Sequence, residues 1–135
     1  MHKLQLAIVA ANSTTAARTA AAENIDACAF SGDWFIIGGR WSGLLSPTRA
    51  LCGSTPARDF RKHPEGYRDD ARRLTPDLTD KLRGYTRTPA GAWLAGVEIY
   101  DDTNAELTTL ADLIALPSLD KFGTRAYLVV IDAHY

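Results

Sequence analysis

The residues best suited to chemistry lie in one stretch, which reads DWFIIGGRWSGLL at positions 33–45. Arg40 brings a planar guanidinium that binds phosphate or carboxylate through two parallel hydrogen bonds. Trp41 brings an indole that stacks on a base or another ring. Gly38 and Gly39 allow backbone conformations closed to other residues and let a ligand approach the main chain. We therefore expect this stretch to bind a ligand.

The same residues also fit structural roles. Trp41 could fill core space, and Arg40 could pair with an internal acid such as Asp33. The glycines do not form a phosphate loop, because GGRWSG has neither G-x-G-x-x-G spacing nor the Lys-Ser/Thr of a Walker A motif. Ser42 lacks the G-x-S-x-G context of a nucleophile. The stretch therefore indicates binding more than catalysis, and we assign no catalytic residue from it.

Other titratable side chains are candidates for acid-base or metal chemistry. His63 lies in a basic loop sequence, whereas Asp132 and His134 alternate onto one face if the last strand continues, which suits an acid-base or metal pair. Asp101 and Asp102 end a strand and begin a helix, where negative charge suits the positive end of the helix dipole. No third metal ligand is evident from the spacing, so the sequence predicts neither a metal nor a cofactor.

Composition and charge are typical of a single domain over residues 1–135. Hydrophobic residues make up 46% of the chain and charged residues 23%, which are ordinary globular values. The net charge is −1, but residues 46–91 hold ten Lys and Arg against six Asp and Glu, so this segment is basic and the rest acidic. Such asymmetry steers anions to one side, although a solvated helical surface explains it equally.

Three other function classes fit the sequence poorly. Acidic residues interleave with the arginines of the basic segment and aromatic residues are few there, so nucleic acid is a less favoured partner than a small anion. Cys28 and Cys52 have neither zinc-site spacing nor the density of a disulfide scaffold. No stretch approaches the roughly 20 apolar residues of a membrane span. We expect a cytoplasmic protein with no membrane partner.

Hydrophobic periodicity predicts four core strands and two core helices. The strands are expected at residues 3–10, 33–37, 92–100 and 125–132, with residues 38–45 extending the second strand through a bend or bulge. The first, second and last strands are apolar on both faces, which predicts that they are buried. The helices are expected at residues 16–28 and from a capping box of Thr103 and Glu106 to Pro117.

The element order β-α-β-β-α-β predicts a ferredoxin-like α+β sandwich. Residues 46–91 would form a basic helical insertion between the second and third strands, with helical patterns at residues 64–74 and 75–84. Two helices would cover one face of a four-stranded antiparallel sheet, and the insertion would cover the second face. Unpaired sheet edges would also allow a homodimer.

The stretch DWFIIGGRWSGLL, with YRDDARRLTPDL and AYLVVID, resembles a loose group of uncharacterised small phage and prophage proteins, especially of actinobacteria. These often carry an aromatic strand that ends in GGRWxG. The resemblance implies a phage protein in the host cytoplasm and transfers no activity. We expect a non-enzymatic accessory protein that binds a small anionic, nucleotide-like ligand, with a role in counter-defence by sequestering an immune signal. The expected ligand-binding residues are Trp34, Gly38, Gly39, Arg40, Trp41, Ser42, Arg61 and His63.

Two other functions stay open at this point. The protein could inhibit a host defence protein or nuclease through its basic insertion, without a small molecule. It could also be a small phosphoester or nucleotide hydrolase that uses His63 or His134. Loss of binding on changing the insertion arginines would indicate the first, and product formation that depends on either histidine would indicate the second.

Overall fold

A computed structural model describes residues 1–27, 32–45, 70–101 and 106–135 of the chain. In these ranges the protein is α+β, with a mixed sheet of five strands and three α-helices. The strands are β1 (His2–Ala10), β2 (Trp34–Ile37), β3 (Ala71–Arg73), β4 (Ile99–Asp101) and β5 (Ala126–His134). The helices are α1 (Thr14–Ala27), α3 (Pro76–Thr86) and α4 (Leu110–Ile114), with 3₁₀ turns η1 (Gly39–Trp41), η3 (Ala92–Gly96) and η4 (Asp120–Phe122). No helix of the described ranges is long and apolar enough to span a membrane.

β1 and β5 form the centre of the sheet. They pair antiparallel over their whole length, from His2 opposite His134 to Ala10 opposite Ala126. β1 also pairs parallel with β4, and β5 pairs antiparallel with both β2 and β3. The strand order is therefore β2-β5-β1-β4, with β3 also on β5. Both central strands are buried along most of their length, as their apolar residues on both faces predict.

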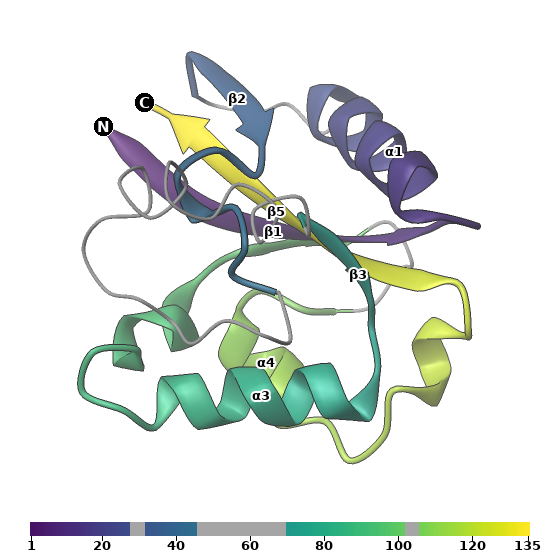
Figure 1. Cartoon of the computed structure of the whole chain (residues 1–135), viewed down its shortest axis with the longest axis vertical. Coiled ribbons are helices and arrows are strands. Elements are labelled where there is room, and N and C mark those ends of the chain that lie inside the picture. The colour runs from purple at the N-terminus through teal and green to yellow at the C-terminus, as the bar shows by residue number, and fades with distance from the viewer. Residues whose placement is uncertain (28–31, 46–69, 102–105) are drawn as a thin grey trace.

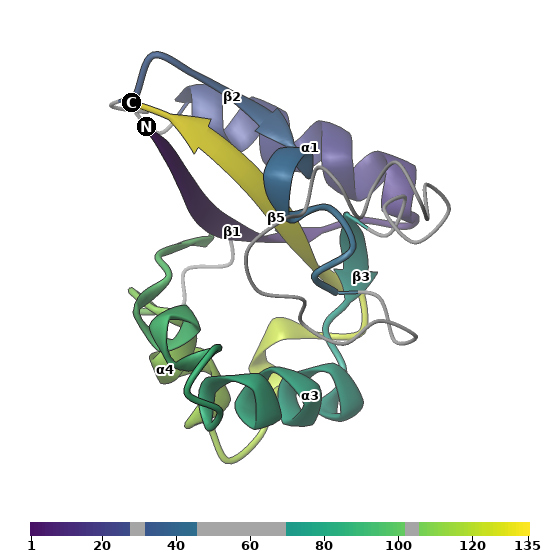
Figure 2. The same ribbon diagram turned by 60° about the vertical axis from the view of Figure 1, so that its left-hand side comes forward.

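Helices cover both faces of this sheet (Figure 1, Figure 2). α1 packs Ala17, Ala21 and Ile25 on one face, against odd-numbered residues of the central strands. α3 and α4 pack on the other face, where their leucines meet even-numbered residues of the same strands. α3 comes from the segment that was expected to cover the second face as an insertion. The burial of both faces removes the apolar side chains of β1 and β5 from water.

One edge of the sheet consists of two collinear pieces of chain. β2 runs along β5 until the backbone N–H of Gly38 donates to the carbonyl of Val130, at 2.8 Å. The N–H of Val130 in turn donates to the carbonyl of Asp70, also at 2.8 Å, and β3 continues along β5 in the same direction. The chain thus leaves this edge at Gly38 and returns to it at Asp70.

The α+β class is confirmed, whereas the described strands do not follow the ferredoxin-like order. β1 does lie between the last strand and the third predicted core strand, β4, and runs parallel to β4, as in that fold. The second strand, however, pairs with β5 and not with β4. The two predicted core helices also lie on opposite faces. The physical reason is that central strands with two apolar faces need a helical layer on each side.

Residues 70–91 belong to the core and are not an insertion on its edge. β3 is part of the sheet, and α3 buries Leu78 and Leu82. The N-cap of α3 is Thr75, the first residue of the helical pattern predicted at residues 75–84, and its hydroxyl accepts the N–H of Leu78 at 3.2 Å. Gly84 lies inside this helix and does not terminate it, because the helix continues to Thr86.

Two other predicted segments fall partly outside the described residues. Of the helical pattern at residues 64–74, the described part contains the strand β3, so that part of the prediction is wrong. Pairing with β5 decides the conformation there, since β-structure depends on long-range partners more than on local spacing. The rest of the predicted insertion, residues 46–69, lies outside the described residues.

The strand predicted at residues 92–100 is mostly a 3₁₀ turn. Ala92–Gly96 form η3, and only Ile99–Asp101 join the sheet as β4. The alternation of residues 92–100 places Trp93 on the same side as Val97 and Ile99, but Trp93 is 50% exposed while its neighbour Leu94 is buried. The spacing of three between Leu94 and Val97, both buried, fits a 3₁₀ turn, in which such residues share a face.

The second core helix begins later than predicted. α4 starts at Leu110, with Thr109 as its N-cap and Asp112 completing a capping box. Glu106, one half of the predicted capping box, precedes this helix without being part of it, and its predicted partner Thr103 lies outside the described residues.

Candidate functional site

The GGRW turn (residues 38–41) packs directly on a buried carboxylate of β5. Gly38 and Gly39 have φ angles of 80° and 56°, which favour glycine. The backbone N–H of Arg40 donates to Oδ2 of Asp132 at 2.9 Å. A Cβ atom on Gly39 would collide with this carboxylate. The predicted extension of the second strand is therefore wrong, because the two positive φ angles turn the chain away from an extended path.

The carboxylate of Asp132 also pairs with a histidine from the other end of the chain. Nδ1 of His2 lies 2.7 Å from Oδ1 of Asp132. A carboxylate only accepts hydrogen bonds, so Nδ1 carries the proton and donates it. Asp132 is 2% exposed, and each of its oxygens has a partner, as a buried charge requires. Nε2 of His2 has no hydrogen-bond partner in the described parts of the chain.

A second imidazole and an indole lie beside this pair. His134 is opposite both His2 on β1 and Trp34 on β2, so three strands align these rings in one row. The rings of Trp34 and His134 stack in parallel, with centroids 4.8 Å apart. His2 meets His134 edge-on at 5.1 Å. Nδ1 of His134 lies 3.4 Å from Oδ2 of Asp33, and its Nε2 lies 3.5 Å from the amino group of Met1.

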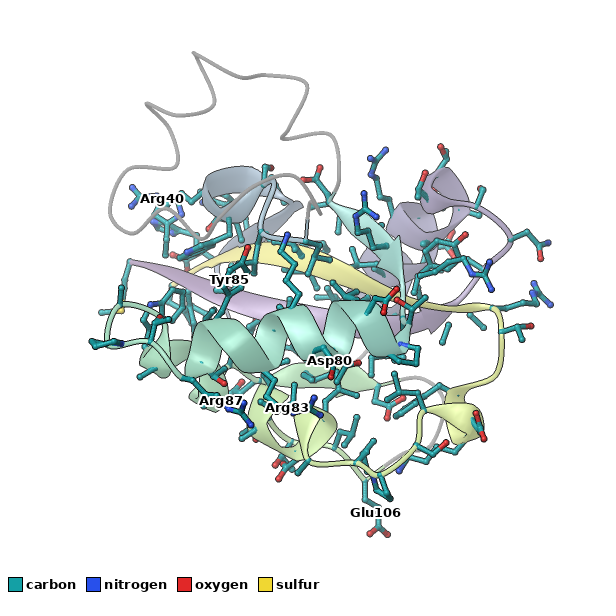
Figure 3. All side chains as sticks on the ribbon, turned by 60° about the horizontal axis from the view of Figure 1, so that its bottom comes forward. Arg40, Asp80, Arg83, Tyr85, Arg87 and Glu106 are labelled. Carbon is teal, nitrogen blue, oxygen red and sulfur yellow. The ribbon has the colours of Figure 1, made fainter. Side chains whose placement is uncertain are left out.

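Of the predicted ligand residues that the structure describes, Trp34 and Arg40 are exposed. The guanidinium of Arg40 has no partner among the described residues and extends outward from the turn (Figure 3). The alternative ion pair with Asp33 is not formed, since that carboxylate faces His134. Trp34 is 44% exposed, and Ile36 on the same strand is 47% exposed. The prediction that this strand is buried is therefore wrong, because β2 lies at the edge of the sheet.

Two other predicted ligand residues of this stretch, Trp41 and Ser42, contribute to the packing of the protein. Trp41 is partly buried and packs against the apolar core, which favours the space-filling alternative. The hydroxyl of Ser42 lies against Gly38, where a Cβ atom would collide with it. Ser42 therefore belongs to the packing of the turn. Arg61 and His63 lie outside the described residues.

His2 is the site residue that sequence reasoning missed. It meets Asp132 across 130 positions of sequence, and no local spacing connects the two. A signal was nevertheless present, since Asp132 interrupts an otherwise apolar final strand. Antiparallel pairing of the first and last strands would place the polar residues at their ends, His2 and His134, in one row.

A groove of about 620 Å³ lies between α3 and residues 116–124. Its arginines are already bonded to protein: Arg73 donates to the carbonyl of Thr124 at 3.0 Å, and Arg83 pairs with Asp80 (Figure 3). Because its arginines already have protein partners, the groove suits an anion less well than the GGRW turn does.

The pair of carboxylates at the end of the third predicted strand lies only partly within the described residues. Asp101 lies on β4, and its neighbour Asp102 is outside the described residues. In the ranges that the structure covers, no group of three or more His, Cys, Asp or Glu side chains is placed to hold a metal ion.

No protein-family model, curated protein or solved structure matches this chain. The interpretation of the site therefore depends on its own geometry.

Proposed function

We propose that the protein binds a small anionic, nucleotide-like ligand at the GGRW turn. The observation that carries this proposal is the guanidinium of Arg40, which has no partner among the described residues, together with the exposed ring of Trp34 on the adjoining strand β2. Asp132 bonds the backbone of Arg40, and His134 stacks on Trp34. These two anchors are two residues apart on β5, or about 7 Å along the strand. A cation and an aromatic ring whose anchors are neighbours on one face of β5 suit the phosphate and the base of one nucleotide.

The turn that presents Arg40 is held in one conformation by its own bonds. The N–H of Gly38 donates to Val130, and the N–H of Trp41 donates back to the carbonyl of Gly38 at 3.2 Å. Asp132 fixes the peptide of Arg40 between them. A preorganised backbone lowers the entropy cost of binding, which favours a specific ligand over transient ion contacts.

The resemblance to phage and prophage proteins adds a biological role to this proposal. A phage protein that holds a nucleotide immune signal removes it from the host cytoplasm and so acts in counter-defence. The chemistry that would recognise such a signal is the same pair of groups, a cation for phosphate and a ring for the base.

Thermal melting with mono-, di- and cyclic nucleotides tests the proposal. A ligand at 100 times its dissociation constant adds about 2.7 kcal/mol to the free energy of unfolding. We expect one class of nucleotide to raise the melting temperature of the wild-type protein by several degrees. Arg40→Ala should abolish most of that shift, because the phosphate loses its cation.

Arg87→Ala is the matched control. Arg87 is exposed at the C-cap of α3, away from Arg40 in Figure 3, and its removal changes the net charge by the same amount. We expect Arg87→Ala to keep the ligand-induced shift. A folded wild-type protein that melts at the same temperature with every nucleotide would overturn the proposal, as would equal losses in the two variants.

A further inference from the structure

We propose that the ligand is a phosphodiester and that the site hydrolyses it, with His2 as the general base. This inference rests on the proposed anion binding at the GGRW turn and adds a reaction to it. Its basis is the hydrogen-bonded chain that runs from the peptide of Arg40 through Asp132 to His2.

The bond to Asp132 fixes the tautomer of His2. Because Nδ1 donates its proton to the carboxylate, Nε2 of the neutral imidazole carries the lone pair that accepts a proton. The side chain of His2 is 23% exposed, and Nε2 has no partner among the described residues. A buried carboxylate that orients an accessible imidazole is the arrangement that prepares a general base in hydrolases of unrelated folds.

The energetic cost of burying the carboxylate of Asp132 argues against a purely structural role for this residue. A carboxylate in a buried strand is seldom more stabilising than an apolar side chain of similar size. Here it is retained with two positive-φ glycines, one of which lets the amide of Arg40 reach Oδ2. Energetically costly polar clusters of this kind occur mainly at functional sites. Asp132 therefore acts as a positioning residue for His2.

His134 supports His2 from the side. Its ring packs against that of His2, is stacked on Trp34, and its two nitrogens face Asp33 and the amino group of Met1. These contacts fix the ring of His134, and through it the ring plane of His2. His134 is therefore a second positioning residue, whereas His2 has the accessible nitrogen.

The reaction consumes one water and needs no other reactant. Nε2 of His2 takes a proton from the water while its oxygen attacks phosphorus and forms the new P–O bond. The P–O bond to the leaving alcohol breaks, and the leaving oxygen receives the proton from the imidazolium of His2. The guanidinium of Arg40 stabilises the charge on the non-bridging oxygens. The products are a phosphomonoester and an alcohol.

The imidazole of His2 and the guanidinium of Arg40 suit a phosphodiester substrate better than a phosphate anhydride. Its leaving group is an alkoxide, which departs poorly without a proton, so an imidazole that shuttles the proton contributes most to this class of substrate. Its single negative charge also matches the one unpartnered cation, Arg40, that the described site provides.

Hydrolysis of bis(p-nitrophenyl) phosphate and of 2′,3′-cyclic AMP tests the inference. We expect His2→Ala to lower the wild-type rate by at least about 100-fold, and imidazole added to the buffer to restore part of it. Rescue by imidazole would not follow from loss of a structural contact. His2→Asn serves if the alanine variant unfolds, because its amide still donates to Asp132 but cannot act as a base.

Melting shifts with AMP keep the two proposals apart. If AMP stabilises the wild-type protein and its His2 variants equally while only the variants lose hydrolysis, both proposals are supported. If AMP stabilises the wild-type protein but neither diester is hydrolysed above the buffer rate, the catalytic inference is overturned and binding stands. Equal hydrolysis by wild type and His2→Ala would overturn it as well.

Discussion

Among single residues, Gly39 is the position where backbone geometry and site chemistry meet. A φ of 56° costs a residue with a side chain about 1–2 kcal/mol, and a Cβ atom would also displace the carboxylate of Asp132. We expect Gly39→Ala to lower the free energy of unfolding by more than about 2 kcal/mol. The same change should weaken ligand binding, because the peptide of Arg40 moves. Urea unfolding measures the change in the free energy of unfolding. The ligand-induced shift in melting temperature measures the change in ligand binding.

Two other glycines serve as controls for Gly39. Gly123 also has a positive φ, 72°, with a ψ of 179°, a backbone region that is essentially restricted to glycine. No atom lies within 4 Å of the position that a Cβ would take, so Gly123→Ala should cost backbone strain alone, about 1–3 kcal/mol. Gly84 lies in α3 with open space around it, and Gly84→Ala should stabilise by about 0.5–1 kcal/mol. If Gly39→Ala cost no more than the backbone strain of about 1–2 kcal/mol, contact with Asp132 would contribute nothing to the stability of the turn.

The residue types of the site could be predicted, but their partners could not. Adjacent glycines, an arginine and a tryptophan mark residues 38–41 as a candidate ligand site without any structure, although the same residues were predicted to continue a strand. Which tryptophan is accessible depends on where the chain turns, and here Trp34 is exposed while Trp41 packs on the core. The bond from His2 to Asp132 depends on the register of β1 against β5, which is a property of the whole sheet.

Among the elements, α4 depends most on its cap. It has five residues, too few to be stable alone. The hydroxyl of Thr109 accepts the N–H of Asp112 at 3.3 Å, and the carboxylate of Asp112 accepts the N–H of Thr109 at 3.1 Å. A hydrogen bond from the side chain of Thr108 to the same carboxylate is the main reason that the pKa of Asp112 lies below its ordinary 3.8.

The lowered pKa makes the cap of α4 sensitive to acid. A carboxyl group whose folded pKa is depressed stabilises the fold above its unfolded pKa, and this contribution is lost as pH falls through the folded pKa. We expect the pKa of Asp112 to rise toward 3.8 in Thr108→Val, as measured by NMR titration. Thr109→Ala should lower the free energy of unfolding by about 1 kcal/mol at pH 7. An unchanged pKa of Asp112 in Thr108→Val would contradict the assigned cause.

Long periodic elements could be predicted from the sequence, whereas short ones could not. β1, β5, α1 and α3 lie where apolar spacing predicts them, because each buries a whole face. The η3 turn was predicted as a strand, since alternation over a few residues does not separate a strand from a 3₁₀ turn. The start of α4 was misplaced because both Thr103–Glu106 and Thr109–Asp112 fit a capping box.

At the scale of the whole molecule, the candidate site includes residues from the buried centre of the sheet and from its short edge strand β2. β5 is buried along its length and bonded to β1 on one side and to β2 and β3 on the other. β2 has four residues and exposes every second side chain to a large degree. His2 and Asp132 belong to the centre, whereas Trp34 and Arg40 belong to the edge. The ligand binding that we propose at the GGRW turn would therefore connect parts of different local stability.

Hydrogen exchange with and without a stabilising nucleotide tests this division. Amides of β1 and β5 should exchange only by global unfolding, and those of Gly38 and Arg40 by local opening of the edge. A ligand bound to the turn must slow both sets by the same factor, because either opening destroys the site. Amides of α4, which open without disturbing the turn, should keep their rates. If nucleotide slowed exchange in β5 but left Gly38 and Arg40 unchanged, the ligand would bind elsewhere on the molecule.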